Sequence, residues 1–298
     1  MGSMSNNVRV GFIGLGMMGY PMASRVASAG WDLFVLDADE GKIDQFCDEH
    51  HANRLIDSKA AQLDVLITML PSSAIVESVL LGKDGANGWA QKLTEGSVVV
   101  DMSSSEPARS RALAHLLEKF GLNFLDAPVS GGVVKAVTGA LAILVGGHAD
   151  VLERQLPLLG LMGQKILHIG AAGCGHAAKA LNNYVSATGL VATVEALIVA
   201  QRFGIEPEVM ADVLNSSSGR SNTSETKVKQ FMLSGTFGSG FALQLMAKDL
   251  NIALSLARAV EYDMPMGKRS VEIWNKAAGV SKSTTDHTEM YRILGEPF

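Results

Sequence analysis

The chain has 298 residues, of which 47% are hydrophobic and 18% charged, and its formal net charge is −5. This length exceeds one typical domain, and this composition suits a globular protein with a large core, so we expect two domains. The negative charge and the absence of a long run of Lys and Arg argue against nucleic acid as a partner, because phosphate binding needs a concentrated basic face.

Cysteine use and apolar runs narrow the class of protein further. The two cysteines, Cys47 and Cys174, are far apart and have neither a disulfide framework nor the spacing of metal ligands. We therefore predict no metal and a reducing, cytoplasmic location. The longest apolar stretch, 184–200, contains Glu195 and closely follows Lys179, which favours a buried helix and no membrane span.

Short apolar runs alternate with helix-length segments in the first half of the chain. The first four runs are almost entirely apolar, as strands buried on both faces are. Segments such as 21–29 and 107–120 have the length and composition of the helices that connect parallel strands. This alternation predicts an α/β domain with a doubly wound parallel sheet. The predicted strands are 8–13, 33–36, 65–69, 98–100, 123–125, 141–145 and 166–169.

The pattern changes after Gly170, where Val-rich runs give way to stretches rich in Ala, Leu, Glu and Lys. One long helix is predicted over 175–201, ending near Gly204 and Pro207. The change predicts a first domain over 5–170 and an all-helical second domain over 171–298. Its further predicted helices are 207–214, 223–233 and 244–260.

A glycine-rich motif follows the first predicted strand directly and opens a helical segment. In Gly14-Leu15-Gly16-Met17-Met18-Gly19, the first glycine permits a tight turn and the second lets backbone approach a pyrophosphate. The third allows close packing of the helix, whose N-terminus then faces the anion. The plain alternative is an ordinary glycine-rich turn. The context predicts a Rossmann dinucleotide site with five contact residues: Gly14, Gly16, Met17, Met18 and Gly19.

The second predicted strand ends in Asp37, eighteen residues after Gly19, where a carboxylate can accept hydrogen bonds from a ribose diol. A carboxylate also repels a 2′-phosphate. No arginine stands nearby to bind one, and the nearest cation is Lys42. The sequence therefore predicts NAD in preference to NADP, with a simple turn residue as the alternative for Asp37.

With these features the chain resembles the β-hydroxyacid dehydrogenase family (3-hydroxyisobutyrate dehydrogenase-like). The resemblance covers essentially the whole chain and implies a 6-phosphogluconate dehydrogenase-like fold, in which a helical domain surrounds a long helix and a substrate cleft lies between the domains. It rests on five blocks in the family's order: Gly-Phe-Ile-Gly-Leu-Gly-Met-Met-Gly-Tyr-Pro-Met-Ala at 11–23, Met69-Leu70-Pro71, Asp126-Ala127-Pro128-Val129-Ser130-Gly131-Gly132, Gly173-Cys174-Gly175 with Lys179 and Asn183, and Lys248-Asp249-Leu250.

The resemblance also implies roles for individual residues. Leu70 and Pro71 would flank the nicotinamide, and Ser104 would replace a cofactor-contacting threonine while keeping its hydroxyl. Lys248 would complete the pocket beside the cofactor. On the substrate side, Ser130, Gly131 and Gly132 would form a cradle for the carboxylate. Asn183 would hold the reacting substrate, and Lys179 would be the catalytic lysine.

The chemistry of Lys179 also follows from its surroundings. On a helix, Lys179 and Asn183 share one face, and a lysine in so apolar a stretch loses hydration, which lowers its pKa. Hydride transfer makes or consumes an alkoxide, so a proton must move at the same oxygen, and a lysine can accept or donate it. The alternative is a lysine that extends to solvent from the start of a helix.

Plainer interpretations stay open for the other residues. Residues 130–132 could form an anion-binding nest or only a turn. Asn183 could bond to a neighbouring turn, and Lys248 could form a surface ion pair. His176 could add a second proton-transfer group. The polar segment 216–223 could contact the far end of the substrate or be a loop with Asn222 or Thr223 as an N-cap.

We expect an NAD-dependent oxidoreductase that acts on a small β-hydroxy acid. A semialdehyde or glyoxylate-type reductase, or an enzyme for a sugar acid such as threonate, is the alternative within the family. A non-catalytic binding protein of the same fold would be expected to lose Lys179. The apolar long helix and the resemblance both suggest a homodimer or homotetramer.

Overall fold

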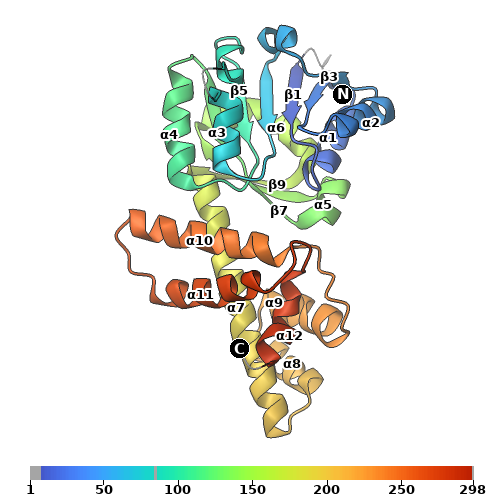
Figure 1. Ribbon diagram of the computed structural model, residues 1–298, viewed down its shortest axis with the longest axis vertical. Helices are drawn as coiled ribbons and strands as arrows, with labels where there is room; N and C mark the ends of the chain where they lie inside the picture. Colours follow the sequence, from blue (N-terminus) through green and yellow to red (C-terminus); the bar gives the residue numbers. More distant parts are fainter. Residues whose placement is uncertain (1–7, 84–85, 297–298) are drawn as a thin grey trace. The chain divides into compact units, whose positions relative to one another are not determined.

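The computed structural model describes residues 8–83 and 86–296. The chain divides into two compact units, the first ending at Lys179 and the second beginning at Ala180 (Figure 1). The predicted limits were 5–170 and 171–298, and residues 5 and 298 lie outside the described part. The division between the units falls inside helix α7 (Cys174–Phe203) rather than before it.

One mixed sheet forms the centre of the first unit, in the order β3-β2-β1-β4-β5-β6-β8-β7, with β9 also paired to β8. The strands from β3 to β6 are parallel to one another. The order reverses between β1 and β4, so the carboxyl ends of these strands are where such sheets bind ligands. The strands are β1 (Arg9–Ile13), β2 (Asp32–Leu36), β3 (Asn53–Arg54), β4 (Val65–Thr68), β5 (Val98–Asp101), β6 (Asn123–Asp126), β7 (Val129–Ser130), β8 (Leu141–Gly147) and β9 (Gly163–Gly170).

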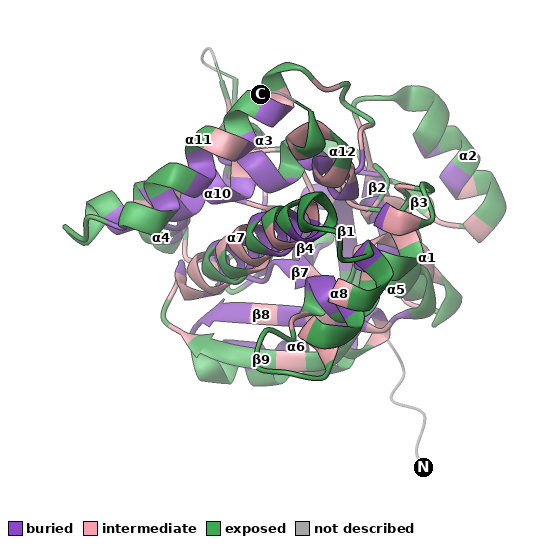
Figure 2. Ribbon diagram, turned by 90° about the horizontal axis from the view of Figure 1, so that it is seen from below, coloured by how far each residue is buried: buried purple, intermediate pink, exposed green. Residues whose placement is uncertain are grey.

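The predicted doubly wound parallel sheet is confirmed for β1 to β6, but its far end differs. Strand β8 runs antiparallel to β6 and β7, and β9 runs parallel to β8. An apolar run does not encode strand direction, which depends on how the connecting chain turns. Figure 2 shows that β8 is largely buried, whereas β9 is mostly exposed.

Alternate residues of the central strands enter two separate core layers. Val65 and Ile67 of β4 pack into one cluster with α1, α2 and α6, whereas Leu66 packs into a second cluster with α3 and α4. Burial on both faces explains why these strands read as continuous apolar runs. The helices of the first unit are α1 (Gly19–Ser28), α2 (Glu40–His50), η1 (Asp57–Gln62), α3 (Ser73–Leu81), η2 (Trp89–Gln91), α4 (Pro107–Glu118), α5 (Gly132–Thr138) and α6 (Ala149–Met162).

Helix α7 is long and apolar enough, by length and composition, to cross a membrane, a test that core helices of soluble proteins also pass. Its Leu190 and Val194 are fully buried in the core of the second unit. The prediction of a buried helix is right for that face only, because Val185 and Phe203 are 67% and 85% exposed. Assembly through this apolar surface stays a prediction.

The described part of the second unit is helical, apart from an isolated bridge between Ala242 and Asp286. The helix predicted over 223–233 is divided at Lys227, whose carbonyl oxygen accepts bonds from the N–H groups of both Phe231 and Met232. This double acceptance marks the change to a π-helical turn. The remaining elements are α8 (Pro207–Asn215), α9 (Asn222–Thr226), η3 (Val228–Leu233), α10 (Leu243–Ala259), α11 (Pro265–Gly279), η4 (His287–Glu289) and α12 (Met290–Gly295).

A buried polar cluster around Asp286 fixes the segment that precedes α10. The Asp286 carboxylate accepts hydrogen bonds from the backbone N–H groups of Gly240 and Phe241, at 2.8 and 3.2 Å. The adjacent His287 is 3% exposed, and its Nδ1 lies 3.0 Å from the Phe241 carbonyl oxygen. Burial first, and then the nearby Lys227 ammonium, lower the pKa of His287 from 6.5 to about 4.

This shift predicts a loss of stability in mild acid. Because the folded pKa of His287 lies below its unfolded value, the unfolded chain takes up the proton first as the pH falls from about 6.5 toward about 4. The free energy of unfolding should therefore fall over this range, and His287→Asn should make the fall smaller. Urea unfolding of the two proteins at several pH values measures it.

His115→Asn is the control, because the His115 side chain is 70% exposed. It should leave the pH dependence of unfolding as in the parent protein. If the His287 and His115 variants show the same pH dependence, burial of His287 does not cause the loss.

Candidate functional site

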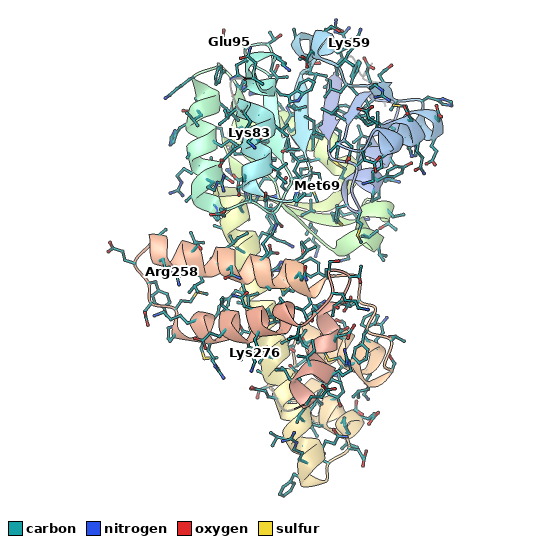
Figure 3. The ribbon with its side chains drawn as sticks, viewed as in Figure 1. Lys59, Met69, Lys83, Glu95, Arg258 and Lys276 are labelled. Atoms are coloured by element: carbon teal, nitrogen blue, oxygen red, sulfur yellow. The ribbon has the colours of Figure 1, made fainter. Side chains whose placement is uncertain are left out.

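The glycine turn has the geometry that its sequence predicts. Gly14 has a φ of +106°, and its N–H donates to the Leu36 carbonyl oxygen at 2.8 Å. A Cβ at Gly14 would overlap the Met69 carbonyl oxygen, and a Cβ at Gly19 would overlap the Gly14 carbonyl oxygen. The first and third glycines are therefore needed by the turn itself. Met69 lies at the opposite end of the first unit from Lys59 and Glu95 (Figure 3).

Gly16 differs from these two glycines because a Cβ placed on it would meet no atom within 4 Å. The protein therefore leaves room beside this backbone, next to the first turn of α1. The first N–H groups of a helix have no partner within the helix, and its dipole favours anions there. Room at Gly16 and the adjacent helix N-terminus fit a pyrophosphate. Met17 is exposed and Met18 half-buried beside this opening.

The carboxylate of Asp37, the predicted ribose acceptor, is held by two backbone N–H groups. Its Oδ2 accepts a hydrogen bond from the Leu15 N–H at 2.6 Å, and its Oδ1 accepts one from the Asp39 N–H at 2.9 Å. Each carboxylate oxygen keeps a further lone pair for a ribose hydroxyl. The sequence did not reveal this second role in holding the glycine turn.

Two cations on the elements that follow Asp37, Lys42 on α2 and Arg54 on β3 opposite Val35, are engaged by acidic side chains. Arg54 forms ion pairs with both Glu40 and Asp44, and the ammonium of Lys42 lies 3.9 Å from the Asp39 carboxylate. These pairs reduce the positive charge available for a 2′-phosphate. The surroundings of Asp37 therefore fit an unphosphorylated ribose better than a phosphorylated one.

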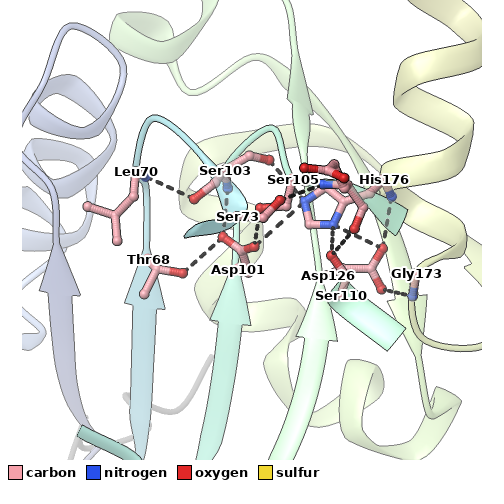
Figure 4. A network of polar contacts seen from close by, with 11 residues as sticks. Thr68, Leu70, Ser73, Asp101, Ser103, Ser105, Ser110, Asp126, Gly173 and His176 are labelled. Atoms are coloured by element: carbon pink, nitrogen blue, oxygen red, sulfur yellow. Dashed lines mark hydrogen bonds and ion pairs between the residues drawn. The ribbon is translucent and has the colours of Figure 1, made fainter. Parts of the chain in front are cut away.

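The loops after β4 and β5 are joined by hydrogen bonds (Figure 4). The Leu70 N–H donates to Ser103 Oγ at 2.8 Å, and the Ser103 N–H donates to Asp101 Oδ1 at 3.1 Å. Asp101 is buried and also accepts bonds from the hydroxyls of Thr68 and Ser105, at 2.9 and 2.8 Å. These bonds fix the segment that contains Leu70. Pro71 is exposed and Ser104 is half-buried.

Asp126, at the end of β6, caps the start of α7. Its fully buried carboxylate accepts hydrogen bonds from the N–H groups of Gly173 and His176, at 2.7 and 2.8 Å. A Cβ at Gly175 would overlap the Leu144 carbonyl oxygen, so glycine lets the helix approach the sheet. Burial raises the pKa of Asp126, while the nearby His176 and these N–H bonds lower it.

His176 lies behind this cap and uses both of its ring nitrogens. Its Nε2 lies 3.0 Å from the Ser103 carbonyl oxygen and its Nδ1 lies 2.8 Å from Ser110 Oγ. A carbonyl oxygen can only accept, so Nε2 donates to Ser103, while Nδ1 and the Ser110 hydroxyl share a second hydrogen bond. The carboxylates of Asp126 and Asp101 are 3.6 and 3.9 Å away. This network was not predicted, because its members are far apart along the chain.

Lys179 and Asn183 lie on one face of α7, as their spacing predicts, and both are buried. The Asn183 side-chain N–H donates to Asp249 Oδ2 at 2.6 Å, and its oxygen accepts a bond from Asn182 at 3.2 Å. Lys248 precedes Asp249 on α10 and is half-buried. The partnership of Asn183 with Asp249 was missed, although Asp249 stands in the same sequence block as Lys248.

The segment 130–132 joins β7 to α5 and requires glycine at two positions. Gly131 and Gly132 have φ values of +137° and +67°, which other residues rarely adopt. Ser130 is half-buried. A Cβ at Gly131 would come within 2.6 Å of the Lys135 side chain, which therefore covers this turn. Lys135 is a cation beside the predicted carboxylate cradle that the sequence analysis did not select.

Two further features belong to the second unit, and substrate contact by 216–223 stays a prediction. In the segment 216–223, Ser221 rather than Asn222 or Thr223 is the N-cap, and it forms a capping box with Ser224. The N-cap position depends on which hydroxyl faces the helix N–H groups, so sequence placed it wrongly by one or two residues. An apolar hollow of about 500 Å³ is lined by none of the predicted site residues; Leu181, Tyr184, Leu256 and Met264 are among its lining.

Comparison with known proteins agrees with this arrangement. Residues 9–170 match the pattern for the NAD binding domain of 6-phosphogluconate dehydrogenase, and residues 173–294 match that for the NAD-binding of NADP-dependent 3-hydroxyisobutyrate dehydrogenase. The chain is 36% identical to human mitochondrial 3-hydroxyisobutyrate dehydrogenase, over 99% of this chain and 89% of that one. The chain belongs to the β-hydroxyacid dehydrogenase family.

Two further relatives show the range of the β-hydroxyacid dehydrogenase family. The 2-(hydroxymethyl)glutarate dehydrogenase of Eubacterium barkeri is 33% identical, over 97% of this chain and 96% of that one. A solved structure of 3-hydroxyisobutyrate dehydrogenase from Mycobacterium tuberculosis with L-serine has a TM-score of 0.88 and 30% identity, covering 96% of this chain and 99% of that chain. The predicted family, fold class and use of an NAD(P) cofactor are thus confirmed, and the protein is an oxidoreductase of this family.

The open space at Gly16 makes a test of the cofactor site possible. Gly16→Ala should fold with unchanged stability, because the added methyl meets no protein atom. It would occupy the room predicted for the pyrophosphate, so the Kd for NAD should rise about tenfold or more. Fluorescence titration with NADH and thermal unfolding measure the two quantities.

Gly160→Ala in α6 is the matched control, because a Cβ there also meets nothing within 4 Å. It should keep the parent affinity. Unchanged NADH affinity in the Gly16 variant would remove this turn from the cofactor site.

Proposed function

We propose that this protein is an NAD-dependent dehydrogenase that oxidises the hydroxyl of a small β-hydroxy acid, with Lys179 as general acid and base. The supporting observation is the position of Lys179. It is 8% exposed and lies three residues after His176, whose N–H is bound by Asp126 at the end of β6. Parallel sheets bind ligands at the carboxyl ends of their strands.

The substrate class is supported by what the named compounds have in common. 2-(Hydroxymethyl)glutarate, 3-hydroxyisobutyrate and L-serine each contain a primary alcohol two carbons from a carboxylate carbon, HOCH₂–CH(R)–COO⁻. The group R differs in size, charge and polarity among them. We infer that this protein takes a substrate with the same unit, and that its R group lies outside the part that reacts.

The cofactor in this proposal is NAD, which supplies the hydride acceptor when bound. Gly14, Gly16 and Gly19, with the backbone of Met17 and Met18, would hold its pyrophosphate at the start of α1. Asp37 would bind the ribose hydroxyls, and its charge would repel a 2′-phosphate. One of the matching patterns is named for an NADP-dependent enzyme, so the preference for NAD rests on Asp37 and on the engaged cations near it.

The proton follows a short path in this mechanism. The neutral amine of Lys179 accepts the hydroxyl proton as the C–H bond is broken, and its ammonium returns the proton in the reverse direction. Asn183 holds the reacting oxygen from one turn further along the same helix, and Asp249 fixes the orientation of its amide. The N–H groups of residues 130–132 bind the carboxylate, with Lys135 as a nearby positive charge.

Replacing the lysine tests the proton transfer. Lys179→Ala should keep the NADH affinity of the parent protein and lose about 10²- to 10⁴-fold in kcat, which is the usual contribution of a general acid or base. NADH formation with a panel of hydroxy acids measures the rate. Lys165→Ala, in the exposed strand β9, should keep full activity. A Lys179 variant that keeps most of its rate would remove the lysine from the mechanism.

The cofactor preference is tested at Asp37. Asp37→Ala removes the ribose acceptor and also the hydrogen bond from the Leu15 N–H, which holds the glycine turn. Affinity for both cofactors should therefore fall, because the turn is less firmly held. Loss of the carboxylate also ends the repulsion of a 2′-phosphate, so NAD should weaken far more than NADP. Titrations with NADH and NADPH compare the two affinities. An equal fall for both would leave Asp37 with only its role in the turn.

A further inference from the structure

The buried network around His176 has no part in the proton transfer described above, yet it joins three segments of the candidate site. We propose that His176 is a positioning residue, which fixes the first turns of α7, and so Lys179, against the loops that follow β4 and β5. This inference rests on the proposed function of Lys179.

The first step in the argument is how firmly the start of α7 is held. Asp126 binds the N–H groups of Gly173 and His176, while the His176 ring bonds to Ser103 and to Ser110 on α4. Backbone and side chain of the same residue thus bind three different elements, β6, α4 and the loop after β5. A helix held at several points on its first turn cannot rotate or slide freely.

The second step is the distance along the helix from His176 to Lys179. An α-helix rises about 1.5 Å per residue with about 3.6 residues per turn, so three residues bring Lys179 less than one turn further. A small rotation at His176 is therefore transmitted directly to the lysine side chain. Misplacement of a catalytic group by about 1 Å can reduce a rate about 10²-fold.

The third step is the connection from His176 to the loop after β4. The Ser103 carbonyl oxygen accepts the His176 Nε2–H, and the hydroxyl oxygen of the same serine accepts the Leu70 N–H. One residue therefore joins α7 to Leu70, which the family resemblance places beside the nicotinamide. The Asp101 carboxylate holds Ser103 in place by accepting a hydrogen bond from the Ser103 N–H.

The chemistry of the ring explains why a histidine suits this position. An imidazole has a hydrogen-bonding nitrogen on each of two sides of a rigid ring, and here each nitrogen has a partner. His176 is 1% exposed. With both nitrogens engaged and no exposed edge, the ring positions other groups and does not exchange protons with the substrate. The alternative of a second proton-transfer group is therefore set aside.

Three variants separate positioning from simple stabilisation. His176→Leu removes both ring bonds, whereas His176→Gln keeps an N–H that can reach the Ser103 carbonyl oxygen. Ser97→Ala is the control, because it removes a buried hydrogen bond to the Leu63 carbonyl oxygen at the amino end of β5. All three are assayed for melting temperature, NADH affinity and kcat.

We expect the loss of the ring bonds to lower kcat and to leave the affinity for NADH nearly unchanged. The His176→Leu variant should lose about 10- to 100-fold in kcat. Its Kd for NADH should change less than about threefold, because the glycine turn and Asp37 are untouched. The glutamine variant should recover most of the rate, and the Ser97 variant should lose melting temperature and keep its kcat. A folded leucine variant with the kcat of the Ser97 control, or a glutamine variant no faster than leucine, would overturn the inference.

If His176→Leu does not fold, Ser110→Ala takes its place, since it removes only the hydroxyl that binds Nδ1. It should lose about threefold or more in kcat, and full activity would contradict the inference.

A parent protein that oxidises no hydroxy acid with NAD contradicts the proposed function, and a second measurement then decides the positioning. Backbone hydrogen exchange should become faster over both 69–71 and 173–179 in His176→Leu or in Ser110→Ala. It should not become faster in the Ser97 control. Unchanged exchange in these two segments would refute the connection.

Discussion

The hydrogen bonds between the buried carboxylate of Asp126 and the start of α7 are the interaction on which the rest of the candidate site depends. The carboxylate accepts two N–H groups from the first turn of α7, and burial raises its pKa because a charge there has lost its hydration. Gly175 lets the backbones approach closely enough for these bonds to form. The start of α7, and with it the place of Lys179, is therefore set by the end of β6.

In the first unit, the middle of each central strand packs in the core, whereas the carboxyl ends of the strands lead into the candidate binding site. Alternate side chains of the central strands fill two core layers, so the sheet is held from both faces. At the carboxyl ends the chain instead presents polar loops, open backbone at Gly16 and the fixed carboxylate of Asp37. A rigid sheet can then hold these loops in place without using their side chains for packing.

The structure differs from the predictions in some helix boundaries and in the direction of one strand. Helix α2 was not among the segments named as helices; its sequence is largely polar, and its buried residues are Ile43 and Phe46. The antiparallel direction of β8 and the division of the predicted helix at Lys227 depend on how the chain turns, which residue pattern does not record. The N-cap is Ser221 and not the predicted Asn222 or Thr223, because its position depends on which hydroxyl faces the helix N–H groups.

The sequence by itself determined the features that depend on neighbouring residues. Apolar runs gave the central strands, glycine spacing gave the turn at Gly14, and four-residue spacing gave the shared face of Lys179 and Asn183. Only the tertiary structure decided which distant groups meet. His176 bonds to a carbonyl oxygen 73 residues away, and Asn183 to a carboxylate 66 residues away. Such pairs are fixed by the packing of whole elements, and no local pattern encodes them.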